Sequence, residues 1–187
     1  DTEQYENVRS EYVAHIERML GFAGMDGAAA KAEAVLALET AIAENLWPRA
    51  DRRNRDLTFN PMTYAEFVAE YPGLDWNAYW RAAGIDTVTD LNVSYPSAMA
   101  PVIALLDSIP VEDWVSYMSY QHISNLAGVL SQEIDDENFH FYSTVLRGVP
   151  EQRQRWERGV ARVGGMNGLG EAVGQIYVQK HFPEAAK

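Results

Sequence analysis

The histidines are the first residues to test for chemistry, because imidazole binds metals and exchanges protons near neutral pH. The sequence has four of them: His15, His122, His140 and His181. The zinc-binding motif HExxH needs two imidazoles four residues apart on one helical face, with a glutamate that polarises the bound water. Every pair here is separated by far more than one helical turn. We therefore expect structural or exposed histidines and no metal site in this chain.

Two other groups of residues have the composition of a ligand site but the wrong context for one. A glycine triplet has the spacing GxGxxxG, whereas a dinucleotide loop needs GxGxxG after a strand, so helix packing through small residues is expected. An acidic run could bind a cation, but a solvated helix start favoured by the helix dipole is the better interpretation. The triplet is Gly168, Gly170 and Gly174, and the run is Glu133, Asp135, Asp136 and Glu137.

The stretch LRGVPEQRQRWERGV, residues 146–160, gathers arginines around one tryptophan. One interpretation is an ordinary helix with Trp156 buried and the arginines on the surface. The other is a basic surface that attracts the carboxylates of peptides or holds a neighbouring domain. Composition alone favours the first interpretation and leaves the second open for Arg147, Arg153, Arg155 and Arg158.

Net charge limits the possible partners. The 187 residues include 27 acidic and 15 basic side chains, a net charge of -12, which disfavours nucleic acid and anionic membrane surfaces as partners. The absence of cysteine rules out disulfides and thiolate metal sites. No window approaches the roughly 18 apolar residues that span a bilayer. The N-terminus DTEQYENVRS is too polar for a signal peptide, so we expect any export signal to lie outside this segment.

The elements that would position these residues are mostly helices, because apolar residues recur at intervals of three and four. The first helix is predicted over residues 5–20, ending near Gly21. The second is predicted over Ala28–Leu46, with Asp26 as its cap. Further helices are predicted from Pro110, over residues 139–146, from Pro150 and over residues 169–177. In the helix from Pro150, one face is expected to be buried: Trp156, Val160 and Val163.

The segment between residues 60 and 95 carries more specific local signals. Thr63 and Glu66 have the spacing of a capping box, and Met62 and Phe67 that of a hydrophobic staple, so a helix should begin at Thr63. A short aromatic helix follows with Trp76, Tyr79 and Trp80. The alternation of Leu91, Val93 and Tyr95 permits one short strand without an obvious partner. We expect one all-α domain over residues 1–187, built of long antiparallel helices with little or no sheet.

Two long runs of the sequence resemble the neprilysin and endothelin-converting-enzyme family of zinc metallopeptidases, in its bacterial oligopeptidase branch. The run FYSTVLRGVPEQRQRWERGVARV and the following GLGEAVGQIYVQKHFPEAAK are similar to the family's L-x-G turn, W-x-R helix and LGEALGxLYVxxxF segment. The matching residues are Leu146, Gly148, Trp156, Arg158 and Leu169–Phe182. Upstream, AVLALETAIAENLWPRADRRNRDLTFNPMTYAEF resembles an LExxLA helix followed by a basic turn and a YNxMTxxEL helix start.

The resemblance implies that this chain is a helical domain that lacks the zinc ligands and catalytic residues of its family. The family's HExxH, its third zinc ligand and its substrate-binding strand all follow the LYVxxxF segment, so zinc is expected in the parent enzyme and no cofactor or catalytic residue in this chain. The domain would roof a chamber that admits small peptides, with the catalytic domain of the same polypeptide and oligopeptide substrates as its partners. Secreted animal members carry a disulfide cysteine where Gly159 stands, so the resemblance implies a bacterial member. The expected location of that enzyme is the periplasm or elsewhere outside the cytoplasm. Residues expected to pack in the core or between domains are Trp156, Tyr177 and Phe182.

Two other functions stay open from the residues alone. A free-standing helical interaction module would have the same helical pattern without a protease. A helical small-molecule binder is the third possibility, because the five tryptophans and ten tyrosines could line a pocket.

Overall fold

The structure is a computed structural model that describes residues 2–165 and 169–183. These residues are mainly helical, which confirms the all-α prediction. They form two compact units, Asp1–Phe141 and Tyr142–Lys187, and each unit is described by itself. The expected single domain over residues 1–187 stays a prediction.

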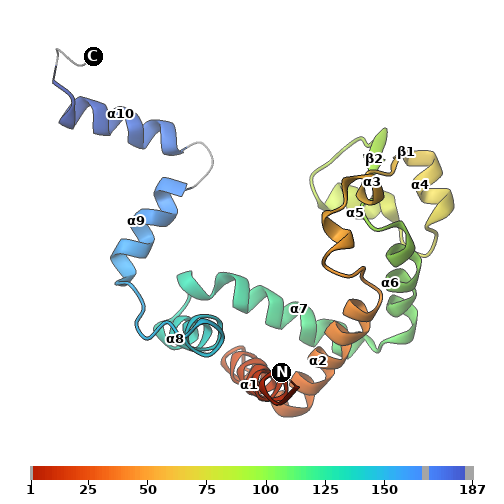
Figure 1. Cartoon of the computed structure of the whole chain (residues 1–187), viewed down its shortest axis with the longest axis horizontal. Coiled ribbons are helices and arrows are strands. Elements are labelled where there is room, and N and C mark those ends of the chain that lie inside the picture. The colour runs from red at the N-terminus through yellow and green to blue at the C-terminus, as the bar shows by residue number, and fades with distance from the viewer. Residues whose placement is uncertain (1, 166–168, 184–187) are drawn as a thin grey trace. The chain divides into compact units, whose positions relative to one another are not determined.

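Three long helices form the main core of the first unit: α1 (Thr2–Phe22), α2 (Ala28–Glu44) and α7 (Val111–Leu126) (Figure 1). Each contributes one apolar face, and together these faces exclude water from a continuous cluster. The fully buried members of this cluster are Ile16, Met19, Leu20, Ala32, Val35, Tyr120 and Ala127. The predicted stripe of α1 is therefore confirmed over its second half, whereas Tyr5 near the start is 66% exposed.

Two predicted helix starts are shifted by one residue. Asp26 does not cap α2, because Gly27 occupies the N-cap position with a positive φ of 69° and no side-chain cap. The backbone carbonyl of Asp26 instead accepts a hydrogen bond from the ammonium group of Lys31. Pro110 is the N-cap of α7 rather than its first residue. Such shifts at helix ends are common, since several neighbouring residues can satisfy the free backbone groups there.

The middle of the first unit is a set of short elements. In chain order they are a 3₁₀ turn (Asp51–Arg53), α3 (Arg55–Thr58), β1 (Pro61–Thr63), α4 (Tyr64–Glu70), α5 (Trp76–Ala82), β2 (Asp90–Asn92) and α6 (Pro96–Ser108). The predicted capping box at the start of α4 is confirmed: the backbone N–H of Thr63 donates to Glu66 at 2.8 Å, and the Thr63 hydroxyl accepts from the backbone N–H of Glu66. Met62 packs on the cluster that contains Phe67, as the staple requires.

The strand prediction was only partly right, because β2 spans Asp90–Asn92 and contains Leu91 but neither Val93 nor Tyr95. The strand also has a partner. β2 pairs antiparallel with β1, with Leu91 opposite Met62. A three-residue strand that begins with proline has no alternating pattern, so the sequence does not reveal β1. The Asn92 side chain joins the pair to the preceding segment: its amide donates to the Thr58 carbonyl at 2.9 Å, and its oxygen accepts from the backbone N–H of Asn60 at 2.7 Å.

A second apolar cluster lies beneath this small sheet. It consists of buried aromatic and aliphatic side chains, Phe67, Tyr71, Trp76 and Val93. The indole N–H of Trp76 donates to the carbonyl of Tyr71 at 2.7 Å, so this buried donor is satisfied. The aromatic helix predicted around Trp76 is confirmed as α5 and supplies the centre of the cluster.

Gly73, in the turn before α5, should tolerate no side chain. Its φ is 108°, and a Cβ there would lie 3.0 Å from Cγ2 of Ile103, so Gly73→Ala should cost about 1 to 3 kcal/mol of unfolding free energy. Gly21 is the matched control, because it lies inside α1 with open space around it, and Gly21→Ala should stabilise by about 0.5 to 1 kcal/mol. Urea unfolding measures both variants. Equal effects would contradict the strained turn.

The first unit ends after α7 with a 3₁₀ turn (Ala127–Val129), α8 (Gln132–Phe139) and the beginning of a π-helical segment (His140–Val145). In the second unit, Gly148 has a positive φ of 68°, and its N–H bonds to the Thr144 carbonyl at 2.9 Å, which ends that segment. Pro150 does not open the next helix, contrary to the prediction. α9 spans Arg155–Gly165, and Glu157 accepts from the backbone N–H of Gln154 at its start.

The last helix, α10, spans Leu169–His181. It confirms the predicted final helix and extends it by one turn. Gly170 and Gly174 lie within it, whereas the first member of the predicted glycine triplet, Gly168, is outside the described residues. No helix in the described ranges has the length and hydropathy needed to cross a bilayer.

Candidate functional site

The second unit presents two apolar helix faces that none of its other described residues covers. In α9, Trp156, Val160 and Val163 follow each other at intervals of four and three, so they share one face. Their exposed fractions are 65%, 66% and 48%. The α10 face has the same spacing and is 40% to 64% exposed, and it consists of Leu169, Val173, Ile176 and Tyr177. The predicted burial of the Trp156 face is therefore not found among the described residues of the second unit.

This result corrects the interpretation of α9 as an ordinary core helix. Among the described residues of α9 and α10, none is buried. The packing of α9 on α10 leaves both apolar faces largely exposed, so amphipathic spacing does not ensure burial. The residues predicted to pack, Trp156, Tyr177 and Phe182, are 65%, 57% and 43% exposed. Their packing between domains stays a prediction.

The four predicted arginines lie in the same unit but not on the apolar faces. Arg147, Arg153 and Arg155 are exposed, and Arg158 is half-buried. The Arg158 Nε donates to the carbonyl of Arg153 at 3.0 Å, which closes the turn that precedes α9. The indole of Trp156 donates to the Gln154 side chain at 2.7 Å. The role of these arginines at a chamber or domain surface stays a prediction.

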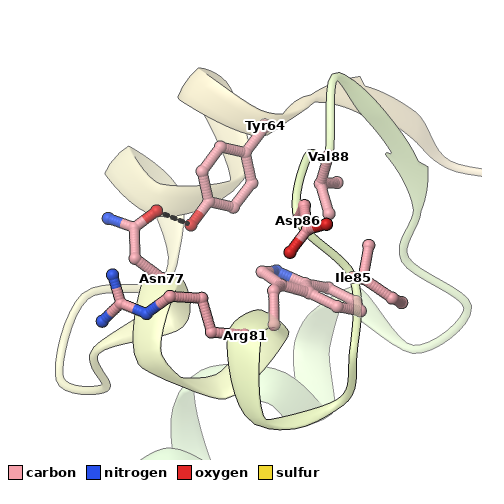
Figure 2. Close-up of a pocket in the computed structure, with 7 residues that line it drawn as sticks. Tyr64, Asn77, Arg81, Ile85, Asp86 and Val88 are labelled. Carbon is pink, nitrogen blue, oxygen red and sulfur yellow. Dashed lines mark hydrogen bonds between the residues drawn. The ribbon is translucent and has the colours of Figure 1, made fainter.

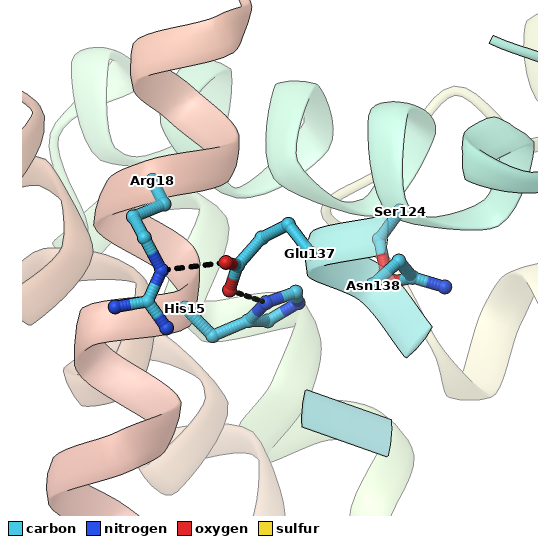
Figure 3. A network of polar contacts seen from close by, with 5 residues as sticks. All are labelled: His15, Arg18, Ser124, Glu137 and Asn138. Carbon is cyan, nitrogen blue, oxygen red and sulfur yellow. Dashed lines mark hydrogen bonds and ion pairs between the residues drawn. The ribbon is translucent and has the colours of Figure 1, made fainter. Parts of the chain in front are cut away.

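The first unit contains a polar cluster that the sequence did not reveal. Nδ1 of the fully buried His15 lies 2.9 Å from Oε1 of Glu137, and Nε of Arg18 lies 2.7 Å from Oε2 of the same carboxylate (Figure 3). A carboxylate only accepts hydrogen bonds, so Nδ1 of His15 carries the hydrogen. The cluster joins α1 to α8. The Ser124 hydroxyl donates to Asn138 at 3.1 Å and joins α7 to the same helix (Figure 3).

Aromatic rings enclose the His15 imidazole. Phe141 stacks on it with ring centres 4.8 Å apart, and Tyr120 meets its edge at 5.9 Å. This burial lowers the pKa of His15, against the opposing effect of the Glu137 carboxylate. The neighbouring Glu39 carboxyl has its pKa raised by burial, although Tyr12 and Gln121 donate to it at 2.8 and 2.9 Å. Both groups hold helices together within the core.

The acidic run is therefore only partly a solvated helix start. Glu133 is exposed, as predicted, in the first turn of α8. Asp135 is 3% exposed, and the Glu137 side chain is 12% exposed. The solvated interpretation is wrong for these two residues, because Asp135 is buried and Glu137 contacts His15 and Arg18 of α1.

The described residues do not fit a zinc site. No group of three or more histidines, aspartates and glutamates within them converges on one point, and the chain has no cysteine. Zinc needs three or four such ligands around a tetrahedral centre. His15, the most deeply buried candidate, is occupied by the Glu137 carboxylate. The zinc that the resemblance implies therefore has no ligand set in this part of the chain.

Aromatic residues of the first unit do line a cavity, as the third sequence hypothesis requires. A volume of about 340 Å³ lies between the end of α2, α5 and α6. Its walls are mainly apolar, and they include Leu46, Phe67, Trp76, Tyr79, Trp80 and Met99. Such a volume is at the lower end of the range for small-molecule pockets.

The comparison with known sequences now decides the family. The sequence model described as Peptidase family M13, for the N-terminal part of these enzymes, matches residues 1–187. The chain belongs to peptidase family M13. This confirms the resemblance that the W-x-R and LYVxxxF segments indicated.

Curated M13 relatives match nearly the whole chain. Neprilysin-2 of Drosophila melanogaster is 32% identical over 193 residues, which cover 93% of this chain and 25% of that protein. Endothelin-converting enzyme 1 of Rattus norvegicus is 24% identical over 180 residues, covering 94% of this chain and 23% of the relative. The chain thus spans about a quarter of the length of the M13 proteins it matches.

Solved M13 structures share the fold. The Mycobacterium tuberculosis zinc metalloprotease Zmp1 in its open state has a TM-score of 0.87 and 36% identity, over 98% of this chain and 29% of Zmp1. Zmp1 in complex with an inhibitor gives the same TM-score and identity, over 96% of this chain and 28% of Zmp1. The N-terminal M13 fold is therefore shared with a bacterial zinc metalloprotease.

Proposed function

We propose that this chain is the helical domain that roofs the chamber of a neprilysin-like zinc metalloendopeptidase and restricts entry to small peptides. The observation that carries the proposal is the pair of uncovered apolar faces on α9 and α10 in a chain that spans a quarter of its relatives. Exposed apolar surface of this extent is typical of an interface. The catalytic domain of the same polypeptide is the partner that the family supplies.

The first unit offers a second surface for the same partner. On α7, Val111, Val115 and Met118 follow at intervals of four and three, and they are 71%, 52% and 60% exposed. The opposite face of α7 is buried against α1 and α2. A helix with one covered and one uncovered apolar face serves both a domain core and an interdomain contact.

In this proposal the domain contributes shape and charge. A rigid roof selects substrates by size and keeps bulk water away from the bond that is cleaved. The exposed arginines Arg147, Arg153 and Arg155, together with Arg158, would lie at the chamber or domain border, where they attract peptide carboxylates. Zinc and its ligands would come from the catalytic domain. The location we propose is extracytoplasmic, in a bacterium.

The test compares the complete reading frame with the 187-residue chain. The complete protein should bind about one zinc per chain and hydrolyse an oligopeptide in a chelator-sensitive way, whereas the 187-residue chain should do neither. Size selection is checked with substrates of increasing length, and cleavage should fall sharply from short peptides to folded proteins. A reading frame without HExxH would refute the proposal and favour the free-standing interaction module. Chelator-sensitive hydrolysis by the 187-residue chain would refute the proposal that this chain has no catalytic activity of its own.

A further inference from the structure

A small polar pocket lies beside the α4–α5 pair, separate from the apolar faces described above. Its volume is about 180 Å³, below the range for drug-sized ligands. At roughly 30 Å³ for each liquid water, it has room for about six waters or one small organic molecule. Tyr64 donates to the Asn77 side-chain oxygen at 2.9 Å across one side of it, which fixes the two residues (Figure 2).

The pocket carries one positive and one negative group. In Figure 2 the Arg81 guanidinium lies on the side of Asn77, and the Asp86 carboxylate lies on the other side, next to Val88. Within the described residues, neither Arg81 nor Asp86 forms an ion pair. A ligand with a cationic and an anionic group could therefore meet a complementary charge at each side.

The third feature is a buried donor without an acceptor. Trp80 lines the pocket, and its indole N–H is buried and has no hydrogen-bond partner in the described part of the chain. This donor lies beneath the pocket surface, so Trp80 contributes its ring to the wall and not its N–H. The other cavity lined by Trp80 is mainly apolar and offers little to accept this hydrogen.

We propose that this pocket binds a free α-amino acid with an apolar side chain. The ammonium group pairs with Asp86, the carboxylate pairs with Arg81, and the Trp80 ring forms part of the wall. The side chain lies against Ile85 and Val88, which complete the lining. Tight binding needs a ligand that carries both an ammonium group and a carboxylate. The pocket volume favours a single amino acid over a longer peptide. The proposal does not depend on zinc or on the chamber role.

The experiment uses the 187-residue chain and L-leucine as the probe. The indole N–H signals of the five tryptophans are followed by NMR during titration, with Trp80→Phe assigning the Trp80 signal. Leucine should shift the Trp80 signal saturably. N-acetyl-leucine lacks the ammonium group and leucinamide lacks the carboxylate, so each should bind at least about tenfold more weakly. These two compounds also represent the C-terminal and N-terminal ends of a peptide.

Variants test the assigned contacts. Asp86→Asn and Arg81→Gln should each weaken leucine binding by at least about tenfold, because each removes one charged partner. Asp107→Asn, at an exposed carboxylate on α6 outside the pocket, is the matched control and should bind leucine as the parent does. Both pocket variants change exposed residues, so their melting temperatures should stay close to that of the parent.

Three results would overturn the proposal. One is the absence of a saturable Trp80 shift at millimolar leucine, and another is equal binding of leucine by the Asp86→Asn and Asp107→Asn variants. The third is equal or tighter binding of N-acetyl-leucine or leucinamide, which would replace the free amino acid with a peptide end. None of these outcomes bears on zinc content or peptidase activity, so failure here is distinguishable from failure of the chamber role.

Discussion

Replacing Glu137 with alanine should lower the free energy of unfolding at pH 7.5 by about 3 kcal/mol. The substitution leaves the fully buried His15 without the acceptor of its Nδ1 hydrogen and removes the link between α1 and α8. Arg18 is 41% exposed, so its ion pair with Glu137 is screened by water and contributes the smaller part. Urea unfolding followed by circular dichroism measures the change.

The loss should grow as the pH falls. Burial lowers the pKa of His15, so below about pH 6.5 the unfolded chain binds a proton that the folded chain does not. The free energy of unfolding therefore decreases as the pH is lowered. Glu137 opposes that burial, because its carboxylate favours the charged imidazole. Without Glu137 the pKa of His15 falls further. The difference between parent and variant should therefore be larger at pH 5.5 than at pH 7.5.

The control for this prediction is Glu17→Ala. Glu17 lies in α1 next to Arg18, but its side chain is exposed and alanine suits a helix interior, so the change should stay within about 0.5 kcal/mol. The raised pKa of Glu39 acts equally in parent and variants and cancels in the comparison. Equal destabilisation by Glu137→Ala and Glu17→Ala would show that the buried cluster does not link the helices.

The second large effect concerns the α10 face. Ile176→Lys should leave the stability of the 187-residue chain within about 0.5 kcal/mol, because Ile176 is already 64% exposed. In the complete enzyme the same change should weaken domain packing by about 3 kcal/mol, roughly a hundredfold, since an apolar contact is lost and a charge is buried. Peptidase activity and protease resistance of the domain junction measure it.

The matched control for this variant lies on the other side of the same helix. Gln175→Lys adds the same charge to α10 away from the face that carries Val173 and Ile176, so the complete enzyme should keep its activity. If both lysine variants were fully active and equally resistant to proteolysis, the α10 face would not be the contact with the rest of the enzyme.

Local sequence signals predicted most of the long helices, but they predicted neither α6 nor β1. The Thr63 and Glu66 pair predicted the start of α4 correctly, because a capping box is complete within four residues. The apolar spacing of α1 and α9 is similar, yet only the α1 face is buried. Periodicity predicts that a face exists, but whether anything covers it depends on residues far away in the sequence or outside this chain.

The sequence could not predict the polar sites for the same reason. His15 and Glu137 are 122 positions apart, and nothing in either neighbourhood indicates the other. The pocket at Trp80 forms because the segment after α5 places Asp86 beside that helix. No spacing rule predicts the path of such a segment. The acidic run was misjudged because Asp135 and Glu137 look like surface residues until α1 is placed beside them. The contact of the four arginines of the second unit with a chamber or another domain remains a prediction.

The link between α1 and α8 also bears on how the polypeptide is made. At a translation rate of about 5 to 20 residues per second, the ribosome adds the 122 residues from His15 to Glu137 in about 6 to 24 s. During that time the nascent first helix has no carboxylate for its imidazole, and part of its apolar stripe is open to holding chaperones. Assembly of this unit is therefore expected to finish late, as a single closing step, rather than progressively from the first helix onwards.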